Sequence, residues 1–405
     1  MKLVVIVPDG MADRPEDFAG RGTPLERAAT PHMDAMVGEG LLGRVVTVPD
    51  SVPVGSDAAN MAVLGVDPAA NRVGRAALEA AGQGVELSDS ELAFRANLVT
   101  LRDGKMEDYS AGAITTEEAK PLVEALAEAL APEGAKLHLG VSYRHLLVVD
   151  DAAGDLDGVT CTPPHDITGR PIAAHLPKGP GAERVGAIME RAKTVLAAHP
   201  ANAERVKVAR APANALWLWG QGRRAALPGL WERFGLTGCV ISAVDLVRGL
   251  GRSMGMDIIT VDGATGDLDT NYAGKGDAAA KALAEYDLVF CHVEAPDEAS
   301  HRGDEGSKIE AIEAVDQEVI SRVRRRAEEL AKSGEDVRVL VLPDHLTPLS
   351  IRTHAHGAVP FVLWGSGVEP SGAAGTGEGA AGESTTLIER GHELLGFALG
   401  RKQAG

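Results

Sequence analysis

The chain of 405 residues is 44% hydrophobic and has a formal net charge of −18, and its length suits two domains or one large domain with an insertion. The acidic excess argues against a general surface for nucleic acid or anionic membranes. The three cysteines, Cys161, Cys239 and Cys291, lie far apart, so we expect neither a disulfide framework nor a zinc-thiolate site, and a reducing cytoplasm fits.

The amino-terminal region predicts a strand, a helix and a second strand. Residues 3–7 are an apolar, β-branched run typical of a buried strand, and Asp9 follows directly. An acidic residue at a strand end is often only a turn former or a helix cap. Residues 23–40 predict a helix and residues 41–48 the next strand. The apolar runs are too short for a signal-peptide core or a bilayer span, so we expect no membrane segment.

Ser56 is a candidate nucleophile. It follows Gly55 and precedes small, helix-favouring residues, which places its hydroxyl at or near a helix amino terminus. A serine there is commonly just a helix cap. Backbone N–H groups and the helix dipole would nevertheless stabilise a phosphoryl group on it, and a nearby metal ion would activate the hydroxyl. Ser56 does not stand in a Gly-x-Ser-x-Gly elbow, which argues against its being the nucleophile of an α/β-hydrolase.

The middle of the chain, residues 76–222, carries its own predicted strands and helices and separates the two halves around it. Its alanine-rich stretches, residues 117–130 and 182–198, predict helices with a structural role. Charged residues are expected in its loops or at strand ends, where the planar fork of arginine suits phosphate and carboxylate oxygens. These residues are Arg95, Arg144, His165 and Asp166. A lone histidine is more often a surface or core residue, and the neighbouring Asp166 leaves a proton-shuttling role open for His165.

The last third of the chain predicts strands that alternate with helices, which is typical of a parallel sheet. The predicted strands are residues 240–241, 257–261, 288–293 and 337–342. A long amphipathic helix is expected over residues 308–332, and a last helix from about residue 385. We therefore expect an α/β fold with a mostly parallel sheet flanked by helices, interrupted by a smaller α+β domain.

Candidate metal ligands lie directly after two of these strands and in the loop that follows the second one. They are Asp297, His301, Asp344, His345 and His354. In open α/β sheets ligands bind beyond the carboxyl ends of strands, where all five are expected. Any one of them alone would more often be a helix cap or a solvated side chain. Five such residues expected at adjacent strand ends, together with Asp9 at another, favour metal ligation. A mixed oxygen and nitrogen set suits manganese, zinc or magnesium.

These motifs resemble, in order and spacing, the cofactor-independent phosphoglycerate mutases of the archaeal type, a family of the alkaline phosphatase superfamily. The matching segments are Asp9-Gly10, Gly55-Ser56-Asp57 with Asn60, Phe94-Arg95-Ala96-Asn97-Leu98, Gly140-Val141-Ser142-Tyr143-Arg144-His145, Asp297-x-x-x-His301, Asp344-His345 and His354. The resemblance implies an alkaline-phosphatase-like core of residues 1–75 and 223–405 and a substrate-enclosing insert of residues 76–222. The segment Gly74-Arg75-Ala76-Ala77 departs from the family pattern, which leaves the role of Arg75 open.

The resemblance also implies an activity, the interconversion of 3-phosphoglycerate and 2-phosphoglycerate in glycolysis and gluconeogenesis through a phosphoserine. Ser56 and His165 would be catalytic, and Arg95, Asn97, Arg144 and Asp166 would bind substrate. One divalent ion would be held by Asp9, Ser56, Asp344 and His345, and a second by Asp297, His301 and His354, with His356 as the alternative to His354. We favour Mn²⁺, with Zn²⁺, Mg²⁺ or Co²⁺ as alternatives.

An alternative function keeps the same metal core but transfers the phosphoryl group to another acceptor. A phosphatase, or a transferase similar to a homoserine kinase, would do so on another small substrate. A metal-stabilised binding protein without turnover is disfavoured by the intact Ser56 and the complete ligand set. In each enzymatic case the expected partner is a small phosphorylated substrate rather than nucleic acid or membrane, and the expected protein is a cytoplasmic monomer or homo-oligomer.

Overall fold

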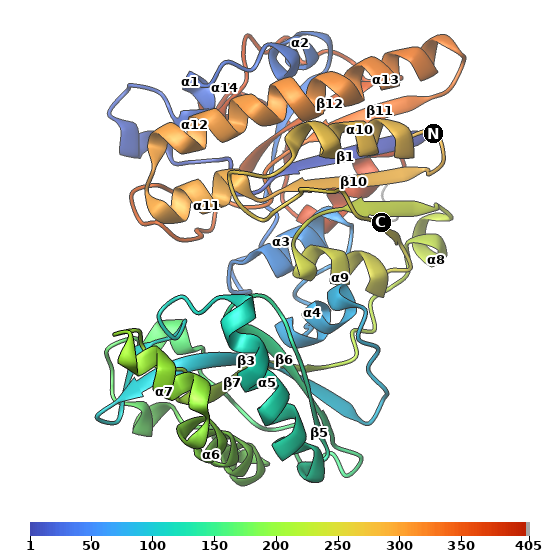
Figure 1. Ribbon diagram of the computed structural model, residues 1–405. Coiled ribbons are helices and arrows are strands. Elements are labelled where there is room, and N and C mark those ends of the chain that lie inside the picture. The colour runs from blue at the N-terminus through green and yellow to red at the C-terminus, as the bar shows by residue number, and fades with distance from the viewer. Residues whose placement is uncertain (402–405) are drawn as a thin grey trace. The chain divides into compact units, whose positions relative to one another are not determined.

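The computed structural model describes residues 1–401, and it divides into two compact units. The larger unit combines residues 1–72 with residues 227–401, and the smaller unit is residues 73–226 (Figure 1). The sequence placed these boundaries after residue 75 and after residue 222. That the smaller unit encloses a substrate stays a prediction.

An eight-stranded sheet forms the centre of the larger unit, in the order β13-β2-β12-β11-β1-β10-β8-β9. Its strands are β1 (Lys2–Pro8), β2 (Leu41–Val45), β8 (Gly238–Ile241), β9 (Asp257–Ile259), β10 (Leu288–Val293), β11 (Val337–Val341), β12 (Val359–Gly365) and β13 (Leu387–Ile388). Strand β12 runs antiparallel to both of its neighbours, and the other pairs are parallel. The apolar runs of β1 and β10 are buried because helices cover both faces of a parallel sheet.

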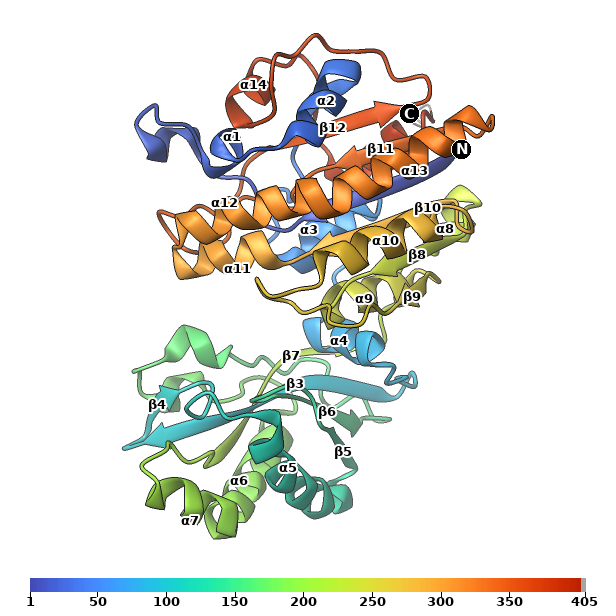
Figure 2. The same ribbon diagram turned by 45° about the horizontal axis from the view of Figure 1, so that its top comes forward.

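Helices of the larger unit connect and flank these strands. They are α1 (Pro24–Arg27), α2 (Pro31–Glu39), α3 (Ser56–Val63), α8 (Leu230–Phe234), α9 (Asp245–Ser253), α10 (Tyr272–Ala282), α11 (Ala295–Arg302), α12 (Glu305–Ala314), α13 (Ser321–Lys332), α14 (Glu378–Gly382) and α15 (Leu394–Ala398). Figure 2 shows α12 and α13 as one long rod in front of the sheet, joined by the π-helical segment Val315–Ile320. Within residues 1–401, no helix has both the length and the apolar character that a bilayer span needs.

Two predicted helices of the larger unit were wrong in extent. The single helix expected over residues 23–40 is split into α1 and α2, because Pro31 lacks the N–H that a continuous helix needs and begins a new one. The last helix, expected from about residue 385, begins only at Leu394, and the short strand β13 precedes it.

The smaller unit is an antiparallel five-stranded sheet packed against helices. Its strands are β3 (Glu91–Arg102), β4 (Lys105–Asp108), β5 (Ala135–His138), β6 (Arg144–Asp150) and β7 (Ala215–Arg223), in the order β4-β3-β6-β5 with β7 on β3. Its helices are α4 (Arg75–Gln83), α5 (Thr116–Leu130), α6 (Ala182–Ala198) and α7 (Pro200–Lys207). The apolar sides of α5 and α6 join the strands in one buried cluster. The predicted class, a mostly parallel α/β core with an α+β insert, is confirmed.

The expected position of Arg95 was wrong. We placed it in a loop or at a strand end, but it lies inside the twelve-residue strand β3 and its side chain is buried. The charge interrupts an otherwise apolar run, so periodicity alone did not show the strand passing through it.

Candidate metal centre

Three neighbouring strands bring the predicted carboxylates together. Strand β1 lies between β10 and β11 and is parallel to both, so their carboxyl ends share one edge of the sheet. Asp9 follows β1, Asp297 lies in the first turn of the helix after β10, and Asp344 follows β11. These three side chains are 0%, 3% and 0% exposed. The order of the strands in the sheet therefore brings three carboxylates from distant segments of the chain into one buried acidic site.

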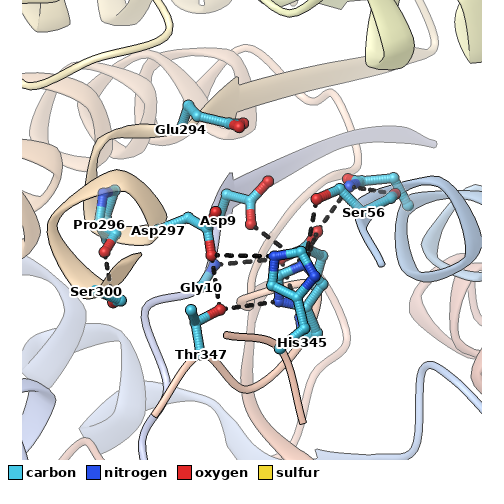
Figure 3. Close-up of polar contacts among 12 residues, drawn as sticks. Asp9, Gly10, Ser56, Glu294, Pro296, Asp297, Ser300, His345 and Thr347 are labelled. Carbon is cyan, nitrogen blue, oxygen red and sulfur yellow. Dashed lines mark hydrogen bonds and ion pairs between the residues drawn. The ribbon is translucent and has the colours of Figure 1, made fainter. Parts of the chain in front are cut away.

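The first group of candidate ligands surrounds the Nε2 atom of His345 (Figure 3). This atom lies 3.2 Å from Ser56 Oγ, 3.6 Å from Asp9 Oδ1 and 3.5 Å from Asp344 Oδ2. Asp9, Asp344 and His345 each offer a ligand atom within 4.8 Å of the others. The structure thus brings together the four residues that the sequence assigned to one ion.

The second group lies beside the first and contains Asp297, His301 and His354. His301 Nε2 lies 3.0 Å from Asp297 Oδ2 and 3.1 Å from His354 Nε2, and His354 Nε2 lies 3.7 Å from Asp297 Oδ1. The ring centroids of His345 and His354 are 4.1 Å apart, so the two groups adjoin. His356, the alternative, is exposed, and its ring lies 3.8 Å from Asp50. The geometry therefore favours His354.

Ser56 is the first residue of α3, and Asn60 fixes the turn that presents it. The Asn60 amide donates to the Ser56 carbonyl oxygen at 2.9 Å and to Asp344 Oδ2 at 2.8 Å. Asn60 is fully buried. It belonged to a quoted motif but was not predicted as a site residue, because an asparagine within a helix gives no signal of its own.

The charges of the site suit a bound cation. The pKa of Asp9 is raised well above its usual range by burial and by the neighbouring Asp344 carboxylate. Burial would also raise the pKa of Asp297, but hydrogen bonds from His301 and His354 hold it well below its usual range. In residues 1–401, these carboxylates form ion pairs with histidines and with no lysine or arginine.

A buried oxygen atom, Asp9 Oδ1, has no hydrogen-bond partner among the described residues 1–401. A buried carboxylate oxygen without a partner is costly, and the usual compensation is a paired charge or a metal ion. Carboxylate oxygens, imidazole nitrogens and a hydroxyl form a donor set for a divalent ion of the manganese, zinc or magnesium type. The residues therefore fit the ions that the sequence implied.

Two further residues near Asp9 were missed by the sequence reasoning. His292 Nε2 lies 2.9 Å from Asp9 Oδ2, and its Nδ1 lies 3.2 Å from Ser242 Oγ. Burial lowers the pKa of His292 to about 3, so the ring is neutral. Glu294 lies near the same place in Figure 3, and burial together with Asp297 raises its pKa to about 8. Their position at the end of β10 was the available signal.

The predicted substrate-binding residues Arg95 and Asn97 lie on β3 and contact Trp219 of β7. The Arg95 guanidinium lies 4.2 Å from the indole centroid, and its Nε pairs with Glu79 at 2.9 Å. Burial lowers the pKa of Arg95 to about 10. Asn97 Oδ1 accepts a hydrogen bond from Trp219 Nε1 at 3.1 Å. Trp219 was not predicted, because its role as a hub depends on strand pairing.

The other predicted residues of the smaller unit are more exposed. His165 lies in the 3-10 turn Pro164–Ile167, with its ring centroid 5.1 Å from that of Trp219 and its Nε2 3.6 Å from Asp166 Oδ1. Burial lowers the pKa of His165. Arg144 is exposed at the start of β6 and lies over the Tyr143 ring at 5.2 Å. Arg95, Asn97 and His165 thus all contact Trp219, and we call these four residues the Trp219 cluster.

Comparisons with known proteins identify the family of the chain. A family model described as 2,3-bisphosphoglycerate-independent phosphoglycerate mutase matches residues 38–202. A relative from Geobacter sulfurreducens, named a probable enzyme of this kind, is 46% identical over 99% of this chain and 100% of its own. The enzyme of that name from Methanothrix thermoacetophila is 49% identical over 91% of this chain and 92% of its own.

Two solved structures share the fold. A protein from Pyrococcus horikoshii is 29% identical, with a TM-score of 0.84 over 100% of this chain and 98% of its own. The cofactor-independent phosphoglycerate mutase of Thermoplasma acidophilum is 28% identical, with a TM-score of 0.66 over 99% of both chains. With identities near one half across nearly the full length of the curated relatives, this chain belongs to the 2,3-bisphosphoglycerate-independent phosphoglycerate mutase family.

Proposed function

We propose that this protein interconverts 3-phosphoglycerate and 2-phosphoglycerate through a phosphoserine at Ser56, as a cytoplasmic enzyme of glycolysis and gluconeogenesis. The observation that carries the proposal is the Ser56 hydroxyl, 3.2 Å from His345 Nε2 and beside the buried carboxylates of Asp9 and Asp344. A serine in ordinary surroundings is a poor nucleophile, whereas this one lies where a cation would be held. The names of the full-length relatives supply the substrate.

Two divalent ions, Mn²⁺ by preference, would be held by the two groups of ligands. Asp9, Ser56, Asp344 and His345 would hold one, and Asp297, His301 and His354 the other. Such ions lower the pKa of a coordinated hydroxyl and neutralise the charge of a transferring phosphoryl group. His301 Nδ1 donates a hydrogen bond to the Arg352 carbonyl oxygen at 3.0 Å. This bond orients the ring so that Nε2 faces Asp297 and His354, the other two residues of the second group.

The transfer itself uses Ser56 and the start of α3. The Ser56 hydroxyl loses its proton, and Oγ forms a bond to phosphorus as the bond from phosphorus to the 3-oxygen of glycerate breaks and that oxygen takes up a proton. In the return step the 2-hydroxyl loses its proton and attacks phosphorus, and Ser56 Oγ leaves and takes up a proton. Backbone N–H groups in the first turn of α3 suit the negative charge of the phosphoserine.

The remaining roles follow from the Trp219 cluster and its exposed neighbours. His165, whose lowered pKa keeps it neutral near pH 7, would exchange the proton of the glycerate hydroxyl. Arg144 is exposed and has a fork that suits a carboxylate or phosphate. Arg95, Asn97 and Asp166 would complete the recognition of substrate, with the charge of Arg95 already shared with Glu79.

The sharpest test replaces the nucleophile. Ser56→Ala should lower the rate of conversion of 3-phosphoglycerate by about 10⁴-fold or more, with Mn²⁺ still bound. Ser51→Ala, on the exposed loop before it, is the matched control and should keep full activity. Turnover retained by Ser56→Ala would rule out this nucleophile.

The same assay separates the rival activity. Incubation with 3-phosphoglycerate should give 2-phosphoglycerate and no release of inorganic phosphate. Free phosphate as the main product would identify a phosphatase that uses the same core, because water would then replace the glycerate hydroxyl as acceptor.

A further inference from the structure

The hydroxyl of Thr347 lies between the two groups of candidate ligands and contacts both. Its Oγ1 lies 2.7 Å from Asp297 Oδ1, in the second group, and 3.1 Å from His345 Nδ1, in the first. Figure 3 shows both contacts, with Thr347 below Asp297 and beside His345. The side chain is fully buried. Neither the motifs nor the proposed reaction gave Thr347 a role.

The direction of these hydrogen bonds follows from the atoms available. A threonine hydroxyl donates one hydrogen and accepts through its lone pairs, whereas an aspartate that ligates a cation is ionised and only accepts. The single Thr347 proton is therefore donated to Asp297. The contact with His345 must then run the other way, so His345 Nδ1 carries a hydrogen and donates it to Thr347 Oγ1.

This direction fixes the tautomer of His345. A neutral imidazole with its hydrogen on Nδ1 has a free lone pair on Nε2. It is Nε2 that lies near Ser56 Oγ, Asp9 and Asp344. The opposite tautomer would point an N–H at the place where the first ion would be held.

We propose that Thr347 is a positioning residue that serves both ions, because one hydroxyl sets the tautomer of His345 and orients the Asp297 carboxylate. It acts through these two residues and touches neither substrate nor reacting atom. The inference rests on the ion-binding part of the proposed function and is independent of which phosphate ester reacts. Groups that orient metal ligands in this way commonly change metal affinity 10- to 100-fold when removed.

The backbone around Thr347 holds the hydroxyl in place. Its N–H donates to the Ala12 carbonyl oxygen at 3.2 Å, and its own carbonyl oxygen accepts from the buried Lys308 Nζ at 3.2 Å. Gly10 lies against the side chain, where an added Cβ would be 2.7 Å from Thr347 Oγ1. The absence of a side chain at Gly10 therefore gives Thr347 and Asp297 the room to meet.

The test compares Thr347→Val with Thr347→Ser. Valine keeps the shape of threonine and removes the hydroxyl, whereas serine keeps the hydroxyl. Mn²⁺ binding to chelator-treated full-length protein would be followed by the electron paramagnetic resonance signal of free Mn²⁺. Backgrounds with Asp344→Asn or His301→Ala would leave one intact group each.

The expected result is a loss of Mn²⁺ affinity of about 10- to 100-fold for Thr347→Val in both backgrounds, with wild-type affinity for Thr347→Ser. Unchanged affinity in either background would overturn the claim that the hydroxyl serves both groups. Matching thermal unfolding of the metal-free variants would show that valine has not simply damaged the fold. Weakened Mn²⁺ binding would support the role of Thr347 even if 3-phosphoglycerate proved not to be the substrate.

A second readout observes the tautomer directly. Imidazole ¹⁵N chemical shifts of metal-free protein, with the His345 signal assigned by its loss in His345→Gln, should show the hydrogen on Nδ1 in wild type and in Thr347→Ser. Thr347→Val should shift the ring toward the Nε2–H tautomer. A wild-type ring protonated on Nε2 would contradict the proposal whatever the binding results.

Discussion

The metal centre and the Trp219 cluster balance their charges in opposite ways. In the metal centre, three buried carboxylates pair with histidines, and Asp9 Oδ1 has no hydrogen-bond partner within residues 1–401. In the Trp219 cluster, the buried Arg95 is paired with Glu79 and stacked on the indole, and Asn97 is hydrogen-bonded to the same ring. Both regions carry charge into a protein interior, but the Trp219 cluster supplies the compensating groups for Arg95 and Asn97.

The difference separates residues that need an outside partner from residues that already have one. Buried polar groups are normally satisfied, so an unsatisfied buried carboxylate indicates a position that suits a cation. A buried arginine with its own glutamate carries no such signal. We infer that the side chains of the metal centre are arranged to bind cations from solution. Part of the predicted substrate-binding set, by contrast, also holds the sheet of the smaller unit together.

The largest expected effect is stabilisation of the larger unit by Mn²⁺. At about 100 times the Kd, each site should add about 2.7 kcal/mol, hence about 5 kcal/mol for two sites. Hydrogen exchange should slow for the amides of β1 and β10, whose ends carry the ligands, whereas the Trp219 cluster gains no ligand. Unchanged exchange in β1 and β10 would contradict ion binding there. Asp344→Asn should remove part of the gain.

The second prediction concerns the ion pair beneath the metal centre. Lys308 Nζ lies 2.9 Å from Asp13 Oδ2, and both side chains are buried. Lys308→Met leaves the Asp13 charge unpaired and should cost about 3–5 kcal/mol of unfolding free energy, measured by urea titration. Adding Asp13→Asn removes that charge and should recover part of the loss. A cost below about 1 kcal/mol for the single change would show that the pair is not needed.

The smallest effect is a pH dependence in the smaller unit. Burial lowers the pKa of His145 to about 4, and its Nδ1 accepts a hydrogen bond from the Gly140 N–H at 3.2 Å. Below pH 6.5 the unfolded chain binds this proton more readily than the folded one, so stability falls as pH falls. The expected contribution is about 2 kcal/mol lost at pH 5 and about 3 kcal/mol at pH 4.

His145→Asn tests this assignment, because asparagine keeps an acceptor near the Gly140 N–H and does not titrate. Urea titrations of both proteins between pH 7 and pH 4 should show a shallower loss of stability in the variant. Equal losses would assign the pH dependence to other groups.

The sequence predicted the parallel core and the family because each rests on local signals. The apolar runs that end at Asp9 and Asp344 can be recognised in the sequence itself. The rule that ligands bind at the carboxyl ends of parallel strands then predicts that these residues lie close together in space. Residues that act through tertiary contacts were not predicted. Thr347, His292 and Trp219 acquire their partners only when β1, β10 and β11, or β3 and β7, are laid side by side.

The predicted extent of one helix and the predicted position of Arg95 were wrong for physical reasons. Pro31 divides a helix that hydrophobic periodicity predicts as one. Arg95 lies inside a strand, although a charged residue is not expected in a buried strand. Glu79 and Trp219 compensate for its burial, and their contacts with Arg95 could not be predicted because both residues are distant in sequence.

The central claim is that two divalent ions meet beside Ser56, and anomalous scattering from crystals soaked in Mn²⁺ tests it most directly. Two peaks are predicted, one among Asp9, Ser56, Asp344 and His345 and the other among Asp297, His301 and His354. A single peak, or peaks away from these side chains, would contradict the account.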